Sequence, residues 1–77
     1  PIDSFKIEDK IDKIRKVISN KDMVAFSEIV FESVSKMEVV VTFLALLELA
    51  KLREVQLLQS ENFQDIIIER INANEKL

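Results

Sequence analysis

Carboxylates are the main candidates for chemistry in this sequence, because the side chains that most often carry out catalysis are missing. The chain of 77 residues contains no His, Cys or Gly. It therefore lacks an imidazole base, a thiol nucleophile and a glycine-rich phosphate loop. Glu38 and Glu48 lie ten residues apart on one predicted helix. Ten residues of helix rise about 15 Å, which is farther apart than two carboxylates that act as a catalytic pair. We expect no enzymatic activity, no metal site and no cofactor.

The composition favours binding over catalysis. Hydrophobic residues make up 48% of the chain and charged residues 32%, with a net charge of −3, and this is too apolar for a disordered segment. The longest apolar run, residues 39–47, is shorter than the roughly 20 residues that span a bilayer. The absence of Cys fits a reducing compartment. We expect one cytoplasmic domain without membrane contact and, because the first residue is Pro rather than Met, a piece of a longer chain.

The N-terminal half is predicted to hold two helices and a short strand. One helical face over residues 4–19 is formed by isoleucines at steps of four, three and four, namely Ile7, Ile11, Ile14 and Ile18. Residues 20–22 indicate a turn, and residues 23–26 indicate a short strand. Ser27 is then expected to cap a second helix.

A third helix is predicted from Ser35 to about Leu52, because residues 35–38 have the Ser-Lys-Met-Glu pattern of a capping box. The Ser35 hydroxyl should accept the backbone N–H of Glu38, and the Glu38 carboxylate should accept that of Ser35. The helix is apolar almost all round. At about 100° per residue, one side groups the residues expected in the core, which are Val40, Phe43, Leu47 and Ala50. The opposite side carries Glu38, Val41, Thr42, Ala45, Glu48, Leu49 and Leu52, with Leu44 at the border.

The C-terminal part is predicted to form a β-hairpin. Val55 to Gln59 and Ile66 to Arg70 are the strands, joined by a loop over residues 60–65. Asp65 is expected to accept backbone N–H groups in the turn, while Phe63 either packs the loop or closes the core. The order of elements is that of an α+β winged helix, with three helices, a small antiparallel sheet and a hairpin wing. We expect this domain over residues 1–71 and a frayed tail over residues 72–77.

The third helix and the hairpin also carry a family resemblance. Residues 42–49 read TFLALLEL, Gln59 ends the next strand, and residues 63–66 read FQDI. Together they resemble the C-terminal domain of kleisins, most closely the bacterial segregation and condensation protein A family, and the resemblance covers essentially the whole chain. One departure is residues 52–54, Leu-Arg-Glu, where the family often has Gly in the turn.

The resemblance implies a winged helix that docks on another protein. In this family the domain binds the head ATPase of a structural-maintenance-of-chromosomes (SMC) protein. The full kleisin bridges two heads, closes a ring around DNA, and carries a segregation and condensation protein B type partner on the rest of its chain. This implies a cytoplasmic, nucleoid-associated protein with a role in chromosome condensation and segregation.

The residues expected to bind the partner lie on the outward side of the third helix and in the hairpin. An apolar strip with charged edges is typical of a docking interface. The expected partner-binding residues are Val41, Leu44, Ala45, Glu48, Leu49 and Leu52 on the helix, and Gln59, Phe63 and Ile67 in the hairpin. An open hairpin edge would also allow strand addition to a partner sheet.

Two alternatives remain open from the residues alone. A DNA-binding winged-helix regulator would place the same side of the helix in the major groove, where Arg, Lys, Asn or Gln must reach the bases. Because Glu38 and Glu48 lie there instead, we expect no direct sequence-specific DNA binding. The second alternative is a homodimer that uses the same apolar strip.

Overall fold

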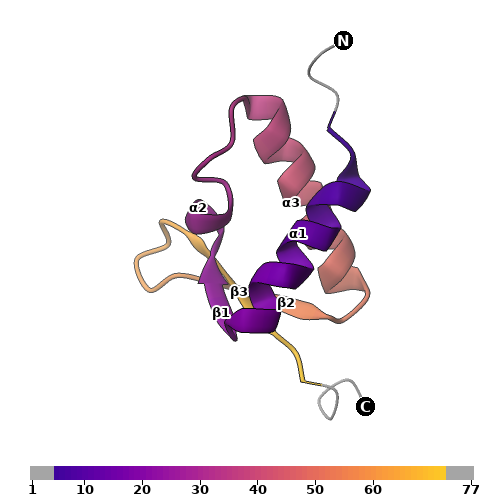
Figure 1. The fold of residues 1–77 in the computed structure, drawn as a ribbon. Coiled ribbons are helices and arrows are strands. Elements are labelled where there is room, and N and C mark those ends of the chain that lie inside the picture. Colours follow the sequence, from indigo (N-terminus) through magenta and orange to yellow (C-terminus); the bar gives the residue numbers. More distant parts are fainter. Residues whose placement is uncertain (1–4, 73–77) are drawn as a thin grey trace.

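The computed structural model describes residues 5–72 and contains three helices and three strands (Figure 1). In chain order these elements are α1 (Ile7–Asn20), β1 (Met23–Ala25), α2 (Phe26–Ile29), α3 (Lys36–Lys51), β2 (Val55–Gln59) and β3 (Ile66–Arg70). The predicted α+β winged-helix architecture is confirmed, and both strands of the hairpin have the predicted bounds. The predicted start at Ser4 and most of the predicted tail lie outside the described residues.

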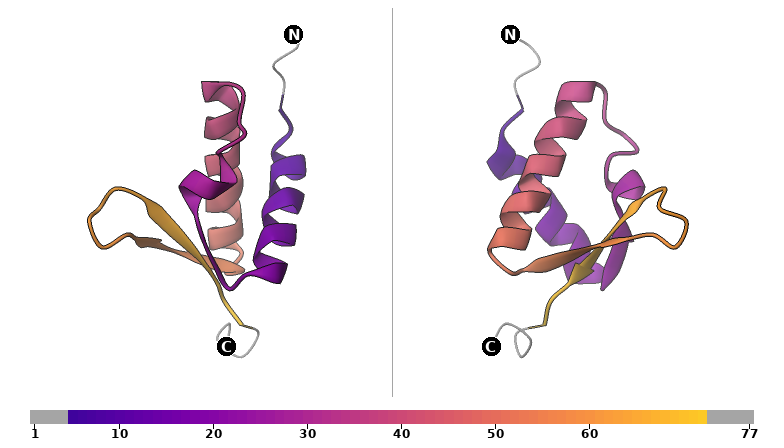
Figure 2. Two further views of the ribbon diagram at one scale, coloured as in Figure 1. Left: turned by 60° about the vertical axis from the view of Figure 1, so that its left-hand side comes forward. Right: turned by 180° about the vertical axis from the view of Figure 1, so that it is seen from behind.

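The sheet has three antiparallel strands in the order β1-β3-β2, so the last strand of the chain is the central one. Ile68 of β3 lies opposite Val24 on one side and Leu57 on the other. Figure 2 shows the helices gathered on one side of the sheet, while the hairpin loop projects away from them. Within the part of the chain that the structure describes, no helix covers the other face of the sheet.

Every helix and strand contributes to one small core. Its buried members are Ile14, Ile18, Val24, Ile29, Ala45, Leu46, Leu49, Val55 and Ile68. The isoleucine face predicted for α1 is confirmed, because Ile14 and Ile18 are buried and Ile7 and Ile11 pack against the same cluster. Each fully buried Leu or Ile contributes about 1.5–3 kcal/mol to stability.

The second helix is shorter than the sequence suggested, and Ser27 does not cap it. Residue Ala25 occupies the cap position, and its N–H donates to the Glu28 carboxylate at 3.3 Å. Ser27 instead donates its hydroxyl to Asp65 in the hairpin, 2.5 Å away. Ser27 lies within the helix and not before it, and its backbone N–H also donates to the Asp65 carboxylate, at 3.3 Å, so this distant carboxylate satisfies an N–H at the helix start that a local cap would otherwise accept.

The start of α3 confirms half of the predicted capping box. The Ser35 hydroxyl accepts the N–H of Glu38 at 3.2 Å, but the Glu38 carboxylate accepts the N–H of Val34 at 2.8 Å and the ammonium of Lys10 at 2.5 Å. These bonds, the one from Lys10 first, lower the pKa of Glu38. Both side chains of this pair are only 12% exposed, so the pair ties α1 to the beginning of α3.

The end of α3 reverses the chain without glycine. Arg53 adopts a left-handed backbone with φ of 62°, and the N–H groups of Arg53 and Glu54 donate to the carbonyls of Ala50 and Leu49, both at 3.0 Å. This is a Schellman motif, in which Gly usually takes the left-handed position. Arg15 of α1 secures the turn through two hydrogen bonds to the Glu54 carboxylate, at 2.9 and 2.7 Å.

Candidate functional site

The third helix carries apolar side chains on two opposite sides, and only one of them is covered. The inner side consists of Thr42, Ala45, Leu46 and Leu49, which are 0–2% exposed. The outer side consists of Met37, Val40, Leu44 and Leu47, at steps of three, four and three, which are 43–54% exposed. We call these four residues the outer strip. A row of large, half-exposed apolar side chains of this kind marks an interaction surface.

The expected orientation of α3 was therefore partly wrong. Val40 and Leu47 were expected in the core but are about half exposed, whereas Ala45 and Leu49 were expected to face a partner but are fully buried. The helix is apolar all round, so its periodicity does not orient it. Contacts with α1 and β2 orient it instead, and the buried Thr42 on the inner side donates its hydroxyl to the Glu38 carbonyl at 2.7 Å.

The other helix residues expected to bind a partner remain accessible. Leu44 lies in the middle of the outer strip and is 46% exposed. Val41 and Glu48 are half-buried on the border between the two sides, and Leu52 is exposed just beyond the helix end. The structure thus keeps part of the predicted set together on one surface and adds Met37, Val40 and Leu47 to it. Sequence reasoning missed these three, although their spacing of three and seven residues was visible.

A hollow between α3 and the hairpin extends the outer strip. Its volume is about 280 Å³, and it is lined by Phe43, Leu57, Leu58, Gln59 and Ile66. We call it the hairpin hollow. Phe43 lies three residues after Val40 and four before Leu47, so the hollow adjoins the strip on the helix surface. The Phe43 ring is held edge-to-face against Phe26, with centroids 5.9 Å apart. Strip and hollow together form what we call the docking face.

The three hairpin residues expected to bind a partner do not lie together. Gln59 lines the hairpin hollow. Ile67 lies opposite Ala25 and Leu58 on the uncovered face of the sheet, because successive residues of β3 alternate between its two faces. Phe63 is 74% exposed in the loop, with φ of 60°, so it does not close the core. Only Gln59 therefore joins the docking face.

Asp65 holds the hairpin against α2. Its carboxylate accepts the Ser27 hydroxyl at 2.5 Å, the Ser27 N–H at 3.3 Å and the N–H of Ile66 at 2.8 Å. These bonds, with the Ser27 hydroxyl first, lower the pKa of Asp65. The predicted role of Asp65 in accepting turn N–H groups is confirmed only for Ile66, because within the loop the N–H groups of Gln64 and Asp65 donate to the Ser60 hydroxyl. The bond to Ser27 also fixes where the base of the wing lies.

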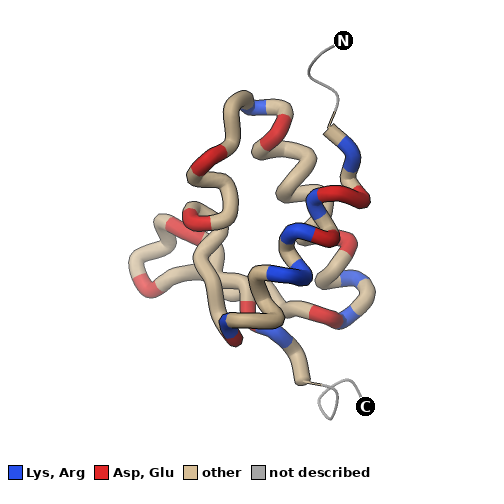
Figure 3. The backbone as a smooth tube through the Cα atoms, viewed as in Figure 1, with Lys and Arg blue, Asp and Glu red and all other residues tan. Residues whose placement is uncertain are grey.

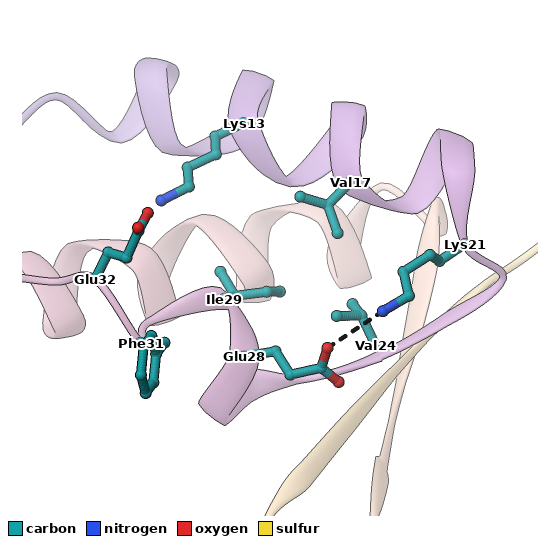
Figure 4. A pocket seen from close by; sticks show the side chains of 8 residues that line it. All are labelled: Lys13, Val17, Lys21, Val24, Glu28, Ile29, Phe31 and Glu32. Atoms are coloured by element: carbon teal, nitrogen blue, oxygen red, sulfur yellow. Dashed lines mark hydrogen bonds and ion pairs between the residues drawn. The ribbon is translucent and has the colours of Figure 1, made fainter.

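A second hollow, of about 240 Å³, lies between α1, β1 and α2. Lys21 pairs there with Glu28 at 3.2 Å, and Figure 4 shows the Lys13 amine directed toward Glu32. The lining mixes both charges with apolar side chains. Among residues 5–72, no group of three or more carboxylates is placed to hold a metal ion.

Charge is unevenly distributed over the surface. Figure 3 shows charges of both signs along α1, while the middle of α3 carries none. Between Lys36 and Lys51 at its two ends, α3 has no Arg, Lys, Asn or Gln, which are the side chains that read base edges. Within the described part of the chain, no helix combines the length and apolar character needed to cross a bilayer. The docking face is suited to an apolar protein surface.

Comparison with known proteins agrees with this geometry. The sequence model of the segregation and condensation protein ScpA family matches residues 4–71. A segregation and condensation protein A from Clostridium acetobutylicum is 52% identical over 73 residues, which cover 95% of this chain and 29% of the relative. Another from Clostridium perfringens is 46% identical over 96% of this chain and 30% of its own length. A third, from Brevibacillus brevis, is 42% identical over 86% of this chain and 26% of its own length.

The chain therefore spans less than a third of the length of these curated relatives. The match nevertheless includes all six elements of the winged helix, from α1 to β3. On this evidence the chain belongs to the segregation and condensation protein ScpA family.

Proposed function

We propose that this domain is the C-terminal docking module of a kleisin and that it binds the head ATPase of an SMC protein through the docking face. The observation that carries the proposal is the outer strip, where four large apolar side chains stand 43–54% exposed in one row on a rigid helix. Membership of the ScpA family supports the choice of partner. The domain then works as a non-enzymatic connector in chromosome condensation and segregation, in the cytoplasm and at the nucleoid.

Binding at this face would follow the usual pattern of an apolar centre with a charged rim. Leu44 lies at the centre of the strip, between Val40 and Leu47. Lys36 and Lys51 lie at the two ends of α3, and Glu48 lies at its border. We propose that Leu44 is the main anchor and that Val41, Glu48 and Leu52 contribute at the edge.

Phe63 and Ile67 would contribute only if the partner also reached the hairpin loop or the uncovered face of the sheet. Ala45 and Leu49 act indirectly, because their burial holds α3 in place. A segregation and condensation protein B type partner would bind the rest of the full-length protein and leave this face to the SMC head.

The test is a pair of charge substitutions at equally exposed positions. Leu44 is 46% exposed in the outer strip, and Met23 is 48% exposed on β1. Leu44→Arg should weaken binding to an isolated SMC head domain by about 100-fold or more, as expected for a central apolar anchor. Met23→Arg should bind like the wild type. Equal affinities of the two variants, measured by titration calorimetry, would contradict the proposal.

Two further measurements address the other readings of the same face. A mobility shift with duplex DNA at low salt should show no tight complex, since the strip lacks base-reading side chains. Sedimentation of the isolated chain should give a monomer. If the chain is a dimer and Leu44→Arg makes it a monomer, the outer strip would instead be assigned to self-association.

A further inference from the structure

The outer edge of the hairpin is an unpaired strand edge without the usual protection. Among residues 5–72, β2 has β3 as its one neighbour in the sheet, and no other described strand pairs with its outer side. Exposed edges normally carry charges, Pro or a bulge that prevent pairing with another chain. The five residues of β2 read VQLLQ, with no charge and no Pro, and their register with β3 is continuous. The opposite edge, β1, is only three residues long and follows the charged Lys21 and Asp22.

The hydrogen bonds at both ends of the hairpin show which backbone groups are free. The N–H of Ile71 donates to the Glu54 carbonyl at 3.0 Å, and the N–H of Ser60 donates to the Asp65 carbonyl at 3.0 Å. In an antiparallel pair every second residue bonds to the neighbour. The backbone groups directed at β3 are therefore the Glu54 carbonyl, the Ser60 N–H and both groups of Gln56 and Leu58. The backbone groups directed outward are those of Val55, Leu57 and Gln59, but Val55 is only 1% exposed, so the accessible ones are those of Leu57 and Gln59.

The free edge adjoins the hairpin hollow. Leu57 and Gln59, whose backbone groups point outward, also line the hollow opposite Phe43 of α3. A segment paired with β2 would therefore place alternate side chains toward this hollow and lie next to the outer strip. None of the residues that line the hollow is charged, and burying an unpaired charge there would be strongly unfavourable.

We propose that the free edge of β2 binds an extended, uncharged segment of the docking partner as an added strand, with one apolar side chain of that segment in the hairpin hollow. The backbone groups of Leu57 and Gln59 supply the hydrogen bonds, and the hollow selects an apolar side chain. This inference rests on the proposed function, because it describes how the partner engages the same face.

The test is amide hydrogen exchange of the full chain with and without an SMC head domain. In the free protein, the amides of Gln56 and Leu58 should exchange slowly, because they bond to β3, whereas those of Leu57 and Gln59 should exchange fast. Adding the head domain should slow exchange at Leu57 and Gln59 by about tenfold or more. A complex that forms while these two amides remain fast would overturn the added strand and leave the proposed function intact. Failure of the wild-type chain to bind the head domain at all would overturn both.

A backbone substitution gives an independent measurement. Gln59→Pro removes one outward N–H from an edge position where Pro is tolerated, while Gln59→Ala keeps that N–H and removes the side chain. Because both variants lack the Gln59 side chain and differ in the backbone N–H, head affinity should be about tenfold lower for Gln59→Pro than for Gln59→Ala. Equal affinities in two folded variants would overturn the added strand. Slow exchange of the Leu57 and Gln59 amides in a concentrated solution of the chain without the head domain would also overturn it, because the added strand would then come from a second copy of the chain.

Discussion

The two sides of α3 are built from similar residues but have opposite environments. The inner side is fully covered by α1 and the sheet, and the outer side is about half exposed. Leucines occur on both, with Leu46 and Leu49 inside and Leu44 and Leu47 outside. The difference shows that an apolar side chain in this domain does not by itself identify the core. What assigns a residue to stability or to docking is the presence of a packing neighbour.

The largest effect is expected from shortening a leucine on the inner side. Leu49→Ala should lower the free energy of unfolding by about 2–5 kcal/mol, because it leaves a cavity in a core this small. Urea denaturation followed by circular dichroism measures the change. Leu47→Ala, on the outer side of the same helix, is the matched control and should change stability by less than about 1 kcal/mol. Equal losses for the two would remove the distinction between the sides. For the same reason, Leu49→Arg is now expected to unfold the domain, contrary to the expectation from the sequence that Leu49 faces outward.

A somewhat smaller effect is expected from enlarging a side chain. Ala45 is fully buried, so Ala45→Leu should destabilise the domain by about 1–3 kcal/mol through overpacking. Thermal unfolding of this variant would be compared with that of Val40→Leu, which adds one methylene group on the outer side. Val40→Leu should be close to neutral. A stable Ala45→Leu variant would mean that the inner side has space that the structure does not show.

The ion pair between α1 and α3 provides a test that depends on pH. Hydrogen bonds from Lys10 and from the Val34 N–H lower the pKa of Glu38 below its ordinary value of 4.5. Folding therefore favours the charged carboxylate. Its contribution to the free energy of unfolding is fully present above pH 4.5 and is lost as the pH falls through the lowered pKa. Glu38→Gln should be less stable than the wild type near neutral pH. The loss of stability should be smaller than that of Leu49→Ala or Ala45→Leu.

The stability difference between Glu38→Gln and the wild type should shrink as the pH is lowered from about 7 to about 3. Urea denaturation at several pH values measures it. Glu48→Gln is a suitable control, since Glu48 lies on the border of α3, two helical turns or more from this pair. A difference that stayed constant over this range would show that the carboxylate charge of Glu38 contributes nothing.

The smallest effect is expected at the end of α3, on neither side of the helix. Arg53 has the left-handed backbone that Gly adopts without steric cost, so Arg53→Gly should raise stability by about 0.5–1 kcal/mol. Its affinity for a head domain should stay unchanged, which makes it a control for stability effects on binding. A loss of stability would mean that the Arg53 side chain makes a favourable contact.

The parts of the fold that follow from local pattern were predicted well from the sequence. The alternation and β-branched residues of the hairpin gave its strand bounds, and the Ser35 hydroxyl marks the start of α3. The isoleucine spacing identified the buried side of α1 because its other side is charged. In each case the signal lies within the element itself, in its cap, its residue types or its charged opposite side.

The parts that were missed depend on residues distant in sequence. The orientation of α3 is set by contacts with α1 and β2, and an all-round apolar helix contains no signal that selects a side. Ser27 bonds to Asp65, 38 residues away, rather than to its own helix. The docking face shares this dependence, since Phe43 meets Leu57 and Ile66 only after the hairpin has folded back.

The central position of β3 has a consequence for synthesis of the protein. β1 and β2 are both hydrogen-bonded to β3 and not to each other. While the ribosome is still making residues 66–70, the nascent chain cannot form the sheet, and Val24 and Val55 lack the Ile68 side chain that completes their core. Pairing of β1 must then close a long loop, which slows folding. The domain, and with it both the hairpin hollow and the free edge of β2, can therefore form only after translation has passed its final strand.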